Sequence, residues 1–275
     1  MASLQAGAAE VLATADPLAK AEAAQALQAA WLAGDLTVRE PCQELVRPAR
    51  PARPELVAPR LVARRRITRG TAGRVALLHA IAHIELNAVD LAADLLARFG
   101  APALPRAFFE DWLQVLAEEG KHFSLLSQRL ADLDSHYGAL PAHDGLWEAA
   151  EATADDLLAR LAVVPLVLEA RGLDVTPMMI AKLEAVEDGA SAAVLRIIYE
   201  EEIGHVAAGR RWYAWAAEAR GLDPWQAWPD LVRRHFKGAL KPPFNHEGRA
   251  NAGLPRGGYE ALAERPVDGV AGERG

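Results

Sequence analysis

The chain has 275 residues, of which 51% are hydrophobic and 24% are charged, and its formal net charge is −7. This composition is typical of a soluble globular protein, and the length allows one sizeable domain with extensions or two small domains. A single cysteine, Cys42, excludes an internal disulfide and a metal site built from several thiolates. Helix-forming residues dominate, and no segment alternates as a half-buried strand does, so we predict an all-α fold.

The first 45 residues predict a helical extension. Two short helical patterns lie within residues 6–34, and the second runs from a proline start to a Gly-Asp stop in "PLAKAEAAQALQAAWLAGD". The start of the chain lacks a basic region followed by an apolar run, and no uninterrupted stretch approaches the ~20 apolar residues of a membrane span. We therefore expect no membrane contact and a cytoplasmic location.

Residues 46–70 form an arginine- and proline-rich segment that includes "RPARPARPELVAPRLVARRR". From Arg47 to Arg74 there are nine arginines and one acid, Glu55. Such a basic run can mark a nucleic-acid-binding protein. This segment is nearly free of aromatic residues that could stack on bases, and its prolines keep it extended. We therefore expect a strap that lies on the acidic helical body rather than a nucleic-acid interface.

Residues 71–221 carry the patterns of a four-helix bundle. The expected helices cover residues 72–100, 105–133, 146–172 and 188–221, with a crossover at 134–145. Pro165 is expected to kink the third helix unless a neighbouring group satisfies the freed carbonyl. The string "LDVTP" at 173–177 predicts an interruption, followed by a short helix. The tail, 222–275, is rich in Pro, Gly and Trp and is expected to be an irregular wrap.

Two strings in the bundle repeat a Glu-x-x-His spacing: "AEEGKHF" contains Glu119 and His122, and "YEEEIGHV" contains Glu202 and His205. Residues three apart lie on one face of a helix, so each pair can direct an oxygen and a nitrogen toward one point. One such pair is weak support for a metal site, because glutamates on amphipathic helices usually face solvent.

The preceding helices each add a glutamate in an apolar stretch, Glu85 in "AIAHIELNAV" and Glu169 in "VVPLVLEARG". The spacing to the next glutamate is 34 residues in one hairpin and 33 in the other. At 1.5 Å per residue, this spacing brings both ligands of a hairpin to about the same height. The pattern is that of ferritin-like dinuclear carboxylate proteins. We predict two iron ions, or manganese or a mixed Fe/Mn pair, held by Glu85, Glu119, His122, Glu169, Glu202 and His205.

Several neighbouring residues are secondary candidates. Glu118 and Glu201 each precede a predicted ligand and are candidates to accept the other imidazole hydrogen of a ligand histidine across the bundle; the alternative is that they face solvent. Tyr199 is a candidate lining residue or radical site, and the alternative is a purely structural tyrosine. His79 and His83 are expected to lie outside the ligand set.

The strings "LLHAIAHIELNAVDLA", "EEGKHF", "LEARGLDVTP", "IIYEEEIGHVAAGRRWY" and "PPFNHEGRANAGL" resemble, in this order, the bacterial family DUF455, which has a ferritin-like domain and no known function. The resemblance covers roughly residues 45–255. It implies a ferritin-like core and supports the six ligands. The family often has Asp before the last ligand glutamate, where this chain has Glu201, which puts a supporting role of that residue in doubt.

Three functions are compatible with a dinuclear site. We favour an oxidase or oxygenase that uses O₂, an unidentified electron donor and a small organic substrate, because the interrupted third helix and the long tail could shape a pocket. The alternatives are metal handling or peroxide removal, and a helical interaction module stapled by metal. A homodimer is left open.

Overall fold

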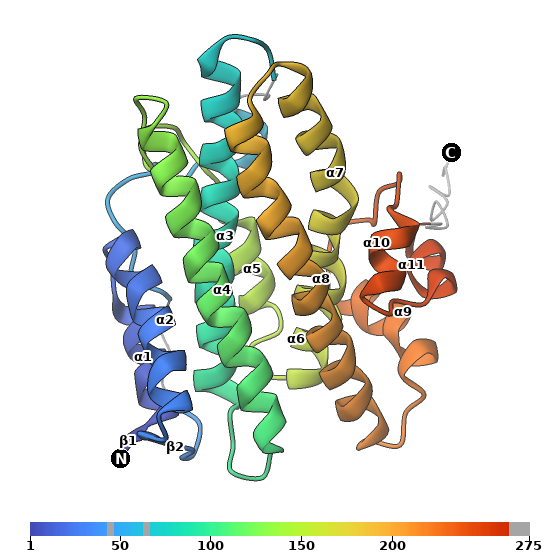
Figure 1. Cartoon of the computed structure of the whole chain (residues 1–275). Coiled ribbons are helices and arrows are strands. Elements are labelled where there is room, and N and C mark those ends of the chain that lie inside the picture. Colours follow the sequence, from blue (N-terminus) through green and yellow to red (C-terminus); the bar gives the residue numbers. More distant parts are fainter. Residues whose placement is uncertain (43–46, 63–66, 264–275) are drawn as a thin grey trace, which may run out of the picture.

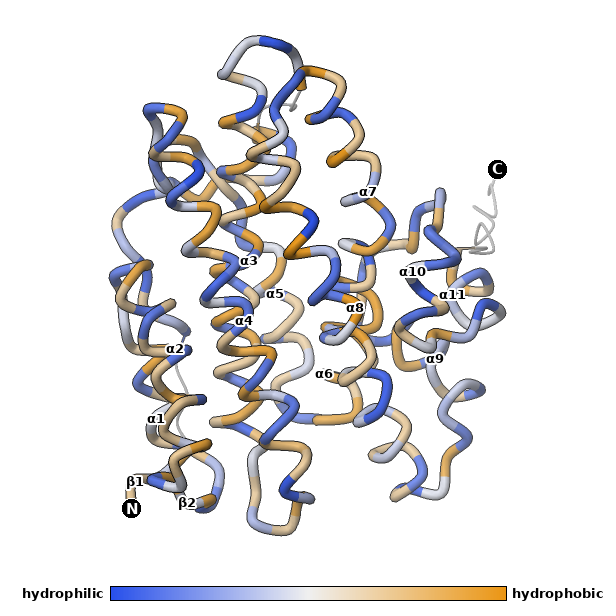
Figure 2. The backbone as a smooth tube through the Cα atoms, in the orientation of Figure 1, coloured by the Kyte–Doolittle hydropathy of each residue, from blue (hydrophilic) through white to orange (hydrophobic). Residues whose placement is uncertain are grey.

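The computed structural model describes residues 1–42, 47–62 and 67–263, and it confirms the all-α prediction. Its centre is a bundle of long helices that run side by side (Figure 1). The bundle helices are α3 (Thr71–Phe99), α4 (Arg106–Ala131), the succession α5 (Gly145–Glu151), α6 (Leu157–Val163), η2 (Val164–Glu169) and α7 (Ala170–Ala185), and α8 (Gly189–Glu218). Figure 2 shows hydrophobic and hydrophilic residues alternating along these helices, as expected where one face of a helix is buried.

Two hairpins make up the bundle. A short loop joins α3 to α4, and residues 132–144 then cross to the second half, as the Gly- and Pro-containing sequence predicts. At the start of α8, the Asp188 carboxylate accepts a hydrogen bond from the Ser191 N–H at 3.0 Å and pairs with Arg74 and Arg129. This N-cap satisfies a backbone donor that the helix cannot satisfy itself and sets where α8 begins.

The third bundle helix differs from the prediction of one helix over 146–172. It is interrupted at residues 152–156, and its next segment starts at the N-cap Asp156. Around Pro165 the chain widens into the π-helix η2. Just before this segment, the Ala162 carbonyl accepts a hydrogen bond from the indole N–H of Trp228 at 2.9 Å. Pro lacks the N–H that continues an α-helix, so a local change of register at this residue is expected.

The predicted interruption at 173–177 is wrong, because α7 continues through it with Pro177 inside the helix. The carbonyl that Pro177 leaves without a partner is that of Leu173, four residues earlier. The side-chain amide of Asn245 donates to this carbonyl at 3.0 Å. The C-terminal segment therefore supplies the hydrogen bond that Pro177 cannot donate, and the helix continues.

The N-terminal extension packs on the outer side of the first hairpin (Figure 1). It comprises α1 (Leu4–Ala13), α2 (Pro17–Leu32) and two short strands, β1 (Ala2–Ser3) and β2 (Leu36–Thr37), which pair in parallel. Helix α2 approaches α4 closely at Gly120, where an added Cβ would lie 2.7 Å from the Ala21 carbonyl oxygen. The extension thus supports the helix that carries Glu119.

The C-terminal segment is more helical than expected. It forms α9 (Pro224–His235), α10 (His246–Asn251) and α11 (Arg256–Ala263), which lie beyond α8 in Figure 1. Residues 264–275 lie outside the described residues. This part of the expected irregular wrap is therefore a small helical layer joined by irregular stretches.

The described part of the arginine-rich segment lies against the bundle. It contains one 3₁₀ turn, η1 (Pro59–Leu61). Arg47 pairs with Asp144, and Arg50 lies 3.1 Å from the buried carboxylate of Asp90. Its residues Arg64, Arg65 and Arg66 lie outside the described residues.

Among the described residues, only α3 is long and apolar enough to cross a membrane. Its most apolar stretch is 78% buried inside the fold, as is typical of a core helix in a soluble protein.

Candidate metal centre

Four elements of the bundle bring the six predicted ligands together. Glu85 comes from α3, Glu119 and His122 from α4, and Glu169 from the end of η2. Glu202 and His205 come from α8. Five of the six are buried, and Glu169 is half-buried with one carboxylate oxygen enclosed. The fold therefore brings the two Glu-x-x-His pairs into contact, and Glu169 lines the same cavity as Glu85 and Glu202.

The two histidines face inward through the same ring atom. Nδ1 of His122 lies 3.1 Å from Oε2 of Glu85 and 3.7 Å from Oε2 of Glu119. Nδ1 of His205 lies 3.0 Å from Oε1 of Glu119 and 3.5 Å from Oε1 of Glu202. Glu119 thus lies between the two imidazoles, whose ring centroids are 5.7 Å apart.

The other ring nitrogen of each histidine faces a glutamate of the opposite helix. Nε2 of His122 lies 2.8 Å from Glu201, and Nε2 of His205 lies 2.8 Å from Glu118. These contacts cross between α4 and α8 in both directions. When Nε2–H of a neutral imidazole donates to the glutamate, the lone pair of the ring is on Nδ1, which points to the centre.

Burial and mutual repulsion dominate the electrostatics of the carboxylates. Burial raises the pKa of Glu85, Glu169 and Glu202, and the charge of a neighbouring glutamate raises each further. Glu119 is the exception: burial also opposes its charge, but the two histidines hold its pKa well below the ordinary value. A centre of this kind favours positive charge at its middle.

The histidines respond in the opposite sense. Burial opposes the imidazolium form, but the nearby carboxylates of Glu119 and Glu85 raise the pKa of His122 to about 10. His205 is likewise buried, and the nearby carboxylates of Glu202, Glu118 and Glu119 raise its pKa well above the ordinary value. Without a metal ion, protons on the histidines supply the positive charge that the carboxylates require.

The residues fit a divalent metal ion. One ligand atom from each of Glu85, Glu119, His122 and Glu202 lies within 4.8 Å of all the others. Both oxygens of Glu119, Oε2 of Glu169 and Nδ1 of His205 are buried without a hydrogen-bond partner among the described residues. Buried polar atoms without partners are costly, and a cation would satisfy them. A set of carboxylates and imidazoles suits iron or manganese better than calcium.

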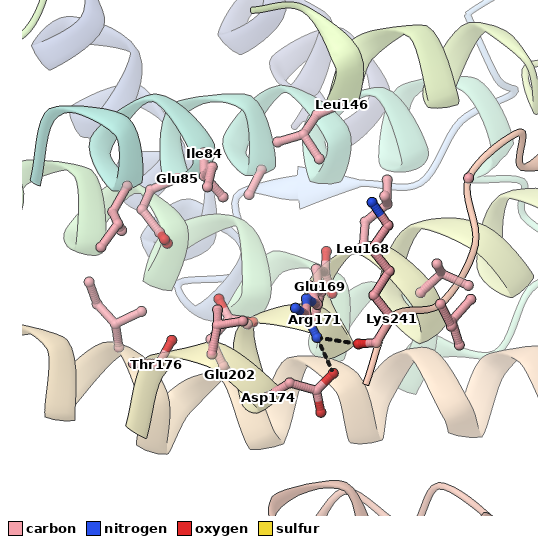
Figure 3. A pocket seen from close by; sticks show the side chains of 18 of the residues that line it. Ile84, Glu85, Leu146, Leu168, Glu169, Arg171, Asp174, Thr176, Glu202 and Lys241 are labelled. Carbon is pink, nitrogen blue, oxygen red and sulfur yellow. Dashed lines mark hydrogen bonds and ion pairs between the residues drawn. The ribbon is translucent and has the colours of Figure 1, made fainter. Parts of the chain in front are cut away.

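A cavity of about 510 Å³ adjoins this cluster, and Glu85, Glu169 and Glu202 form part of its wall (Figure 3). Most of the remaining wall is apolar, and Ile84, Leu146 and Leu168 are examples labelled in the figure. The volume lies within the roughly 300–1,000 Å³ that is typical of small-molecule sites.

Three other residues singled out in the sequence lie away from the cluster. Tyr199 does not line this cavity: its hydroxyl accepts a hydrogen bond from Asn245 at 2.8 Å, and it borders a second hollow. His79 accepts a hydrogen bond from the backbone of Gly138, and His83 lies 2.8 Å from the Tyr137 hydroxyl. Of the two alternatives for Tyr199, these contacts favour the structural one.

Four charged residues of the cavity wall were not among the predicted site residues: Arg171, Asp174, Lys241 and Arg249. Arg171 lies in the predicted third helix, 146–172, Asp174 in the predicted interruption, 173–177, and Arg249 in the expected irregular wrap. Their meeting depends on the tail folding back onto α7.

The chain is similar to one protein family and to one curated protein. A family model described as "Protein of unknown function (DUF455)" matches residues 13–260. A protein of Haemophilus influenzae, described as "Uncharacterized protein", is 44% identical over 209 residues, which is 74% of this chain and 72% of the relative. No solved structure matches the chain significantly.

Proposed function

The chain belongs to the DUF455 family, whose function is unknown, and from its buried Glu/His cluster we propose that it is a dinuclear carboxylate protein of the ferritin-like kind that uses O₂ to oxidise a small organic molecule. The observation that carries the proposal is the contact of three of the six candidate ligands with a largely apolar cavity of about 510 Å³. An iron-storage or peroxide-removing site has no need of such a cavity. The proposed setting is the cytoplasm.

The candidate ligands would be divided around Glu119, which faces both histidines. Two reduced iron ions bound there would supply electrons to O₂ and so allow oxidation of a molecule in the cavity, with an external donor restoring the reduced state. Manganese, or one ion of each kind, is compatible with the same oxygen and nitrogen atoms.

The protein itself would contribute orientation and exclusion of water. Glu118 and Glu201 would hold the two imidazoles with Nδ1 facing inward. The π-helix would direct Glu169 toward the centre, and short π-helical segments within α-helices occur frequently at functional sites. The apolar cavity wall would keep bulk water from the reacting molecule.

Oxygen consumption by Fe(II)-loaded protein tests this proposal. We expect O₂ uptake to stop once the bound ions, about two per chain, are oxidised, and to resume when a reductant is added. Continued oxidation of excess Fe(II) would instead indicate an iron-handling protein. Absence of O₂ uptake by protein that retains its metal would indicate a structural staple, and either result would contradict the proposal.

Two variants on α4 control this experiment. Glu119→Ala should abolish O₂ uptake, because it removes the carboxylate that both histidines face. Glu110→Ala should leave it unchanged, because Glu110 is an exposed residue paired with Arg106 on the same helix.

A further inference from the structure

The charged side chains are distributed unevenly along the wall of the cavity beside the glutamates. In Figure 3, Glu85 lies to the left, and Lys241 lies to the right, with Arg171 and Asp174 between them. Apart from the three glutamates of the centre, the charged side chains of the described wall comprise three cations and one anion. The cations are Arg171, Lys241 and Arg249, and the anion is Asp174.

The Asp174 carboxylate is already paired with the Arg249 guanidinium. The two side chains form a bidentate pair, with Nε to Oδ1 and Nη2 to Oδ2 both at 2.8 Å, and both are buried. The Arg249 guanidinium also lies 4.9 Å from the centroid of Phe244 and 4.6 Å from that of Tyr259. Its remaining terminal nitrogen, Nη1, is buried without a hydrogen-bond partner among the described residues. A buried donor of this kind normally has an acceptor.

Arg171 and Lys241 lie together at the exposed part of the wall. Nη1 of Arg171 donates to the Lys241 carbonyl at 2.6 Å and lies 3.4 Å from Asp174, while its side chain remains 41% exposed. Within the described ranges, no carboxylate pairs with the Lys241 ammonium. Two positive charges therefore border this part of the cavity without a full complement of negative charge.

We propose that the cavity binds an apolar monocarboxylate, with its carboxylate held by Arg171 and Lys241 and its apolar body extending along the wall toward Glu85 and Glu202. The planar guanidinium of Arg171 matches a carboxylate, and the Nη1 donor of Arg249 is available in the same wall. The inference rests on the proposed function for the claim that the bound molecule is the substrate. The binding itself depends only on the cavity.

Isothermal titration with decanoate and decan-1-ol tests the proposal, because these probes share an apolar chain and differ in the head group. We expect the metal-loaded protein to bind decanoate at least about tenfold more tightly than decan-1-ol, the effect of one charged hydrogen bond. The double variant Arg171→Gln, Lys241→Gln should lose this preference and still bind decan-1-ol. Retained alcohol binding shows that the cavity is intact.

A matched control is Arg106→Gln, which removes an exposed arginine from α4 away from the cavity. It should bind both probes as the wild type does. Equal binding of the two probes by the wild type, or no binding of either, would overturn the proposal. So would a preference for decanoate that the double variant retains.

A repeat of the titration with metal-free protein separates this inference from the proposed function. The preference for decanoate should persist without metal if the carboxylate contacts Arg171 and Lys241. Loss of the preference on metal removal would place the carboxylate on the metal ions and refute the assignment. A protein that binds decanoate but takes up no metal would refute the proposed function alone.

Discussion

Gly209 of α8 faces the π-helix that carries Glu169, and replacing it tests how that helix is positioned. In Gly209→Ala, the added Cβ would overlap Cβ of Pro165 and lie 2.5 Å from its Cγ. Carbon atoms pack best at about 3.5–4.0 Å, so the two elements would have to separate by about 1 Å. The proline ring is rigid and cannot rotate away.

This overpacking should lower the free energy of unfolding by about 1–3 kcal/mol. For a chain of this size, that loss corresponds to a fall in Tm of about 2–6 °C. Since Pro165 and Glu169 belong to the same π-helix, the displacement should also lower the bound metal per chain. Thermal unfolding of the metal-free and metal-loaded proteins, together with elemental analysis, measures both effects.

Gly204→Ala is the matched control on the same helix. Its added Cβ meets no atom within 4 Å, so the variant should gain up to about 1 kcal/mol from helix propensity and keep its metal. If Gly209→Ala proved as stable as this control and bound as much metal, the contact between Pro165 and Gly209 would have no part in placing Glu169.

Three further predictions concern other buried groups. Glu119→Gln should reduce bound metal from about two ions per chain to less than one, with unchanged helical circular dichroism; full metal content by elemental analysis would contradict its central position. Lys20→Met leaves Asp90 with Arg50 alone and should cost about 3 kcal/mol by urea unfolding, and a cost near zero would argue against the buried pair. Burial raises the pKa of Asp188, but hydrogen bonds and arginines outweigh it and lower that pKa overall, so the stability that its charge adds is complete above the unfolded pKa of about 3.9. The advantage of the wild type over Asp188→Asn should therefore shrink as the pH falls below that value, and an advantage that stayed constant down to acid unfolding would refute this.

The meeting of the six candidate ligands could be predicted because it depends on local rules. Helical rise and the i, i+3 spacing fix the height and the face of each residue, and both apply within one hairpin at a time. The lone Glu85 and Glu169 were informative because an ionised carboxylate is costly in an apolar stretch unless something compensates it.

The course of the third helix and the wall of the cavity could not be predicted in this way. Pro177 ends a helix by every local rule, and it is tolerated here because Asn245, in the tail, satisfies the Leu173 carbonyl. The same tail brings Arg249 to Asp174. Contacts between residues some 70 positions apart decide both features, and a periodicity confined to one segment carries no information about them.

The most direct test of the account is the metal content of protein purified without oxygen, followed by its absorbance on exposure to air. We predict about two iron or manganese ions per chain, with new near-ultraviolet absorbance when air is admitted to the iron form. The Glu119→Ala variant should show neither. A wild-type chain that binds no transition metal even after reconstitution would contradict the central claim. The six residues would then form a buried network of protonated histidines and glutamates.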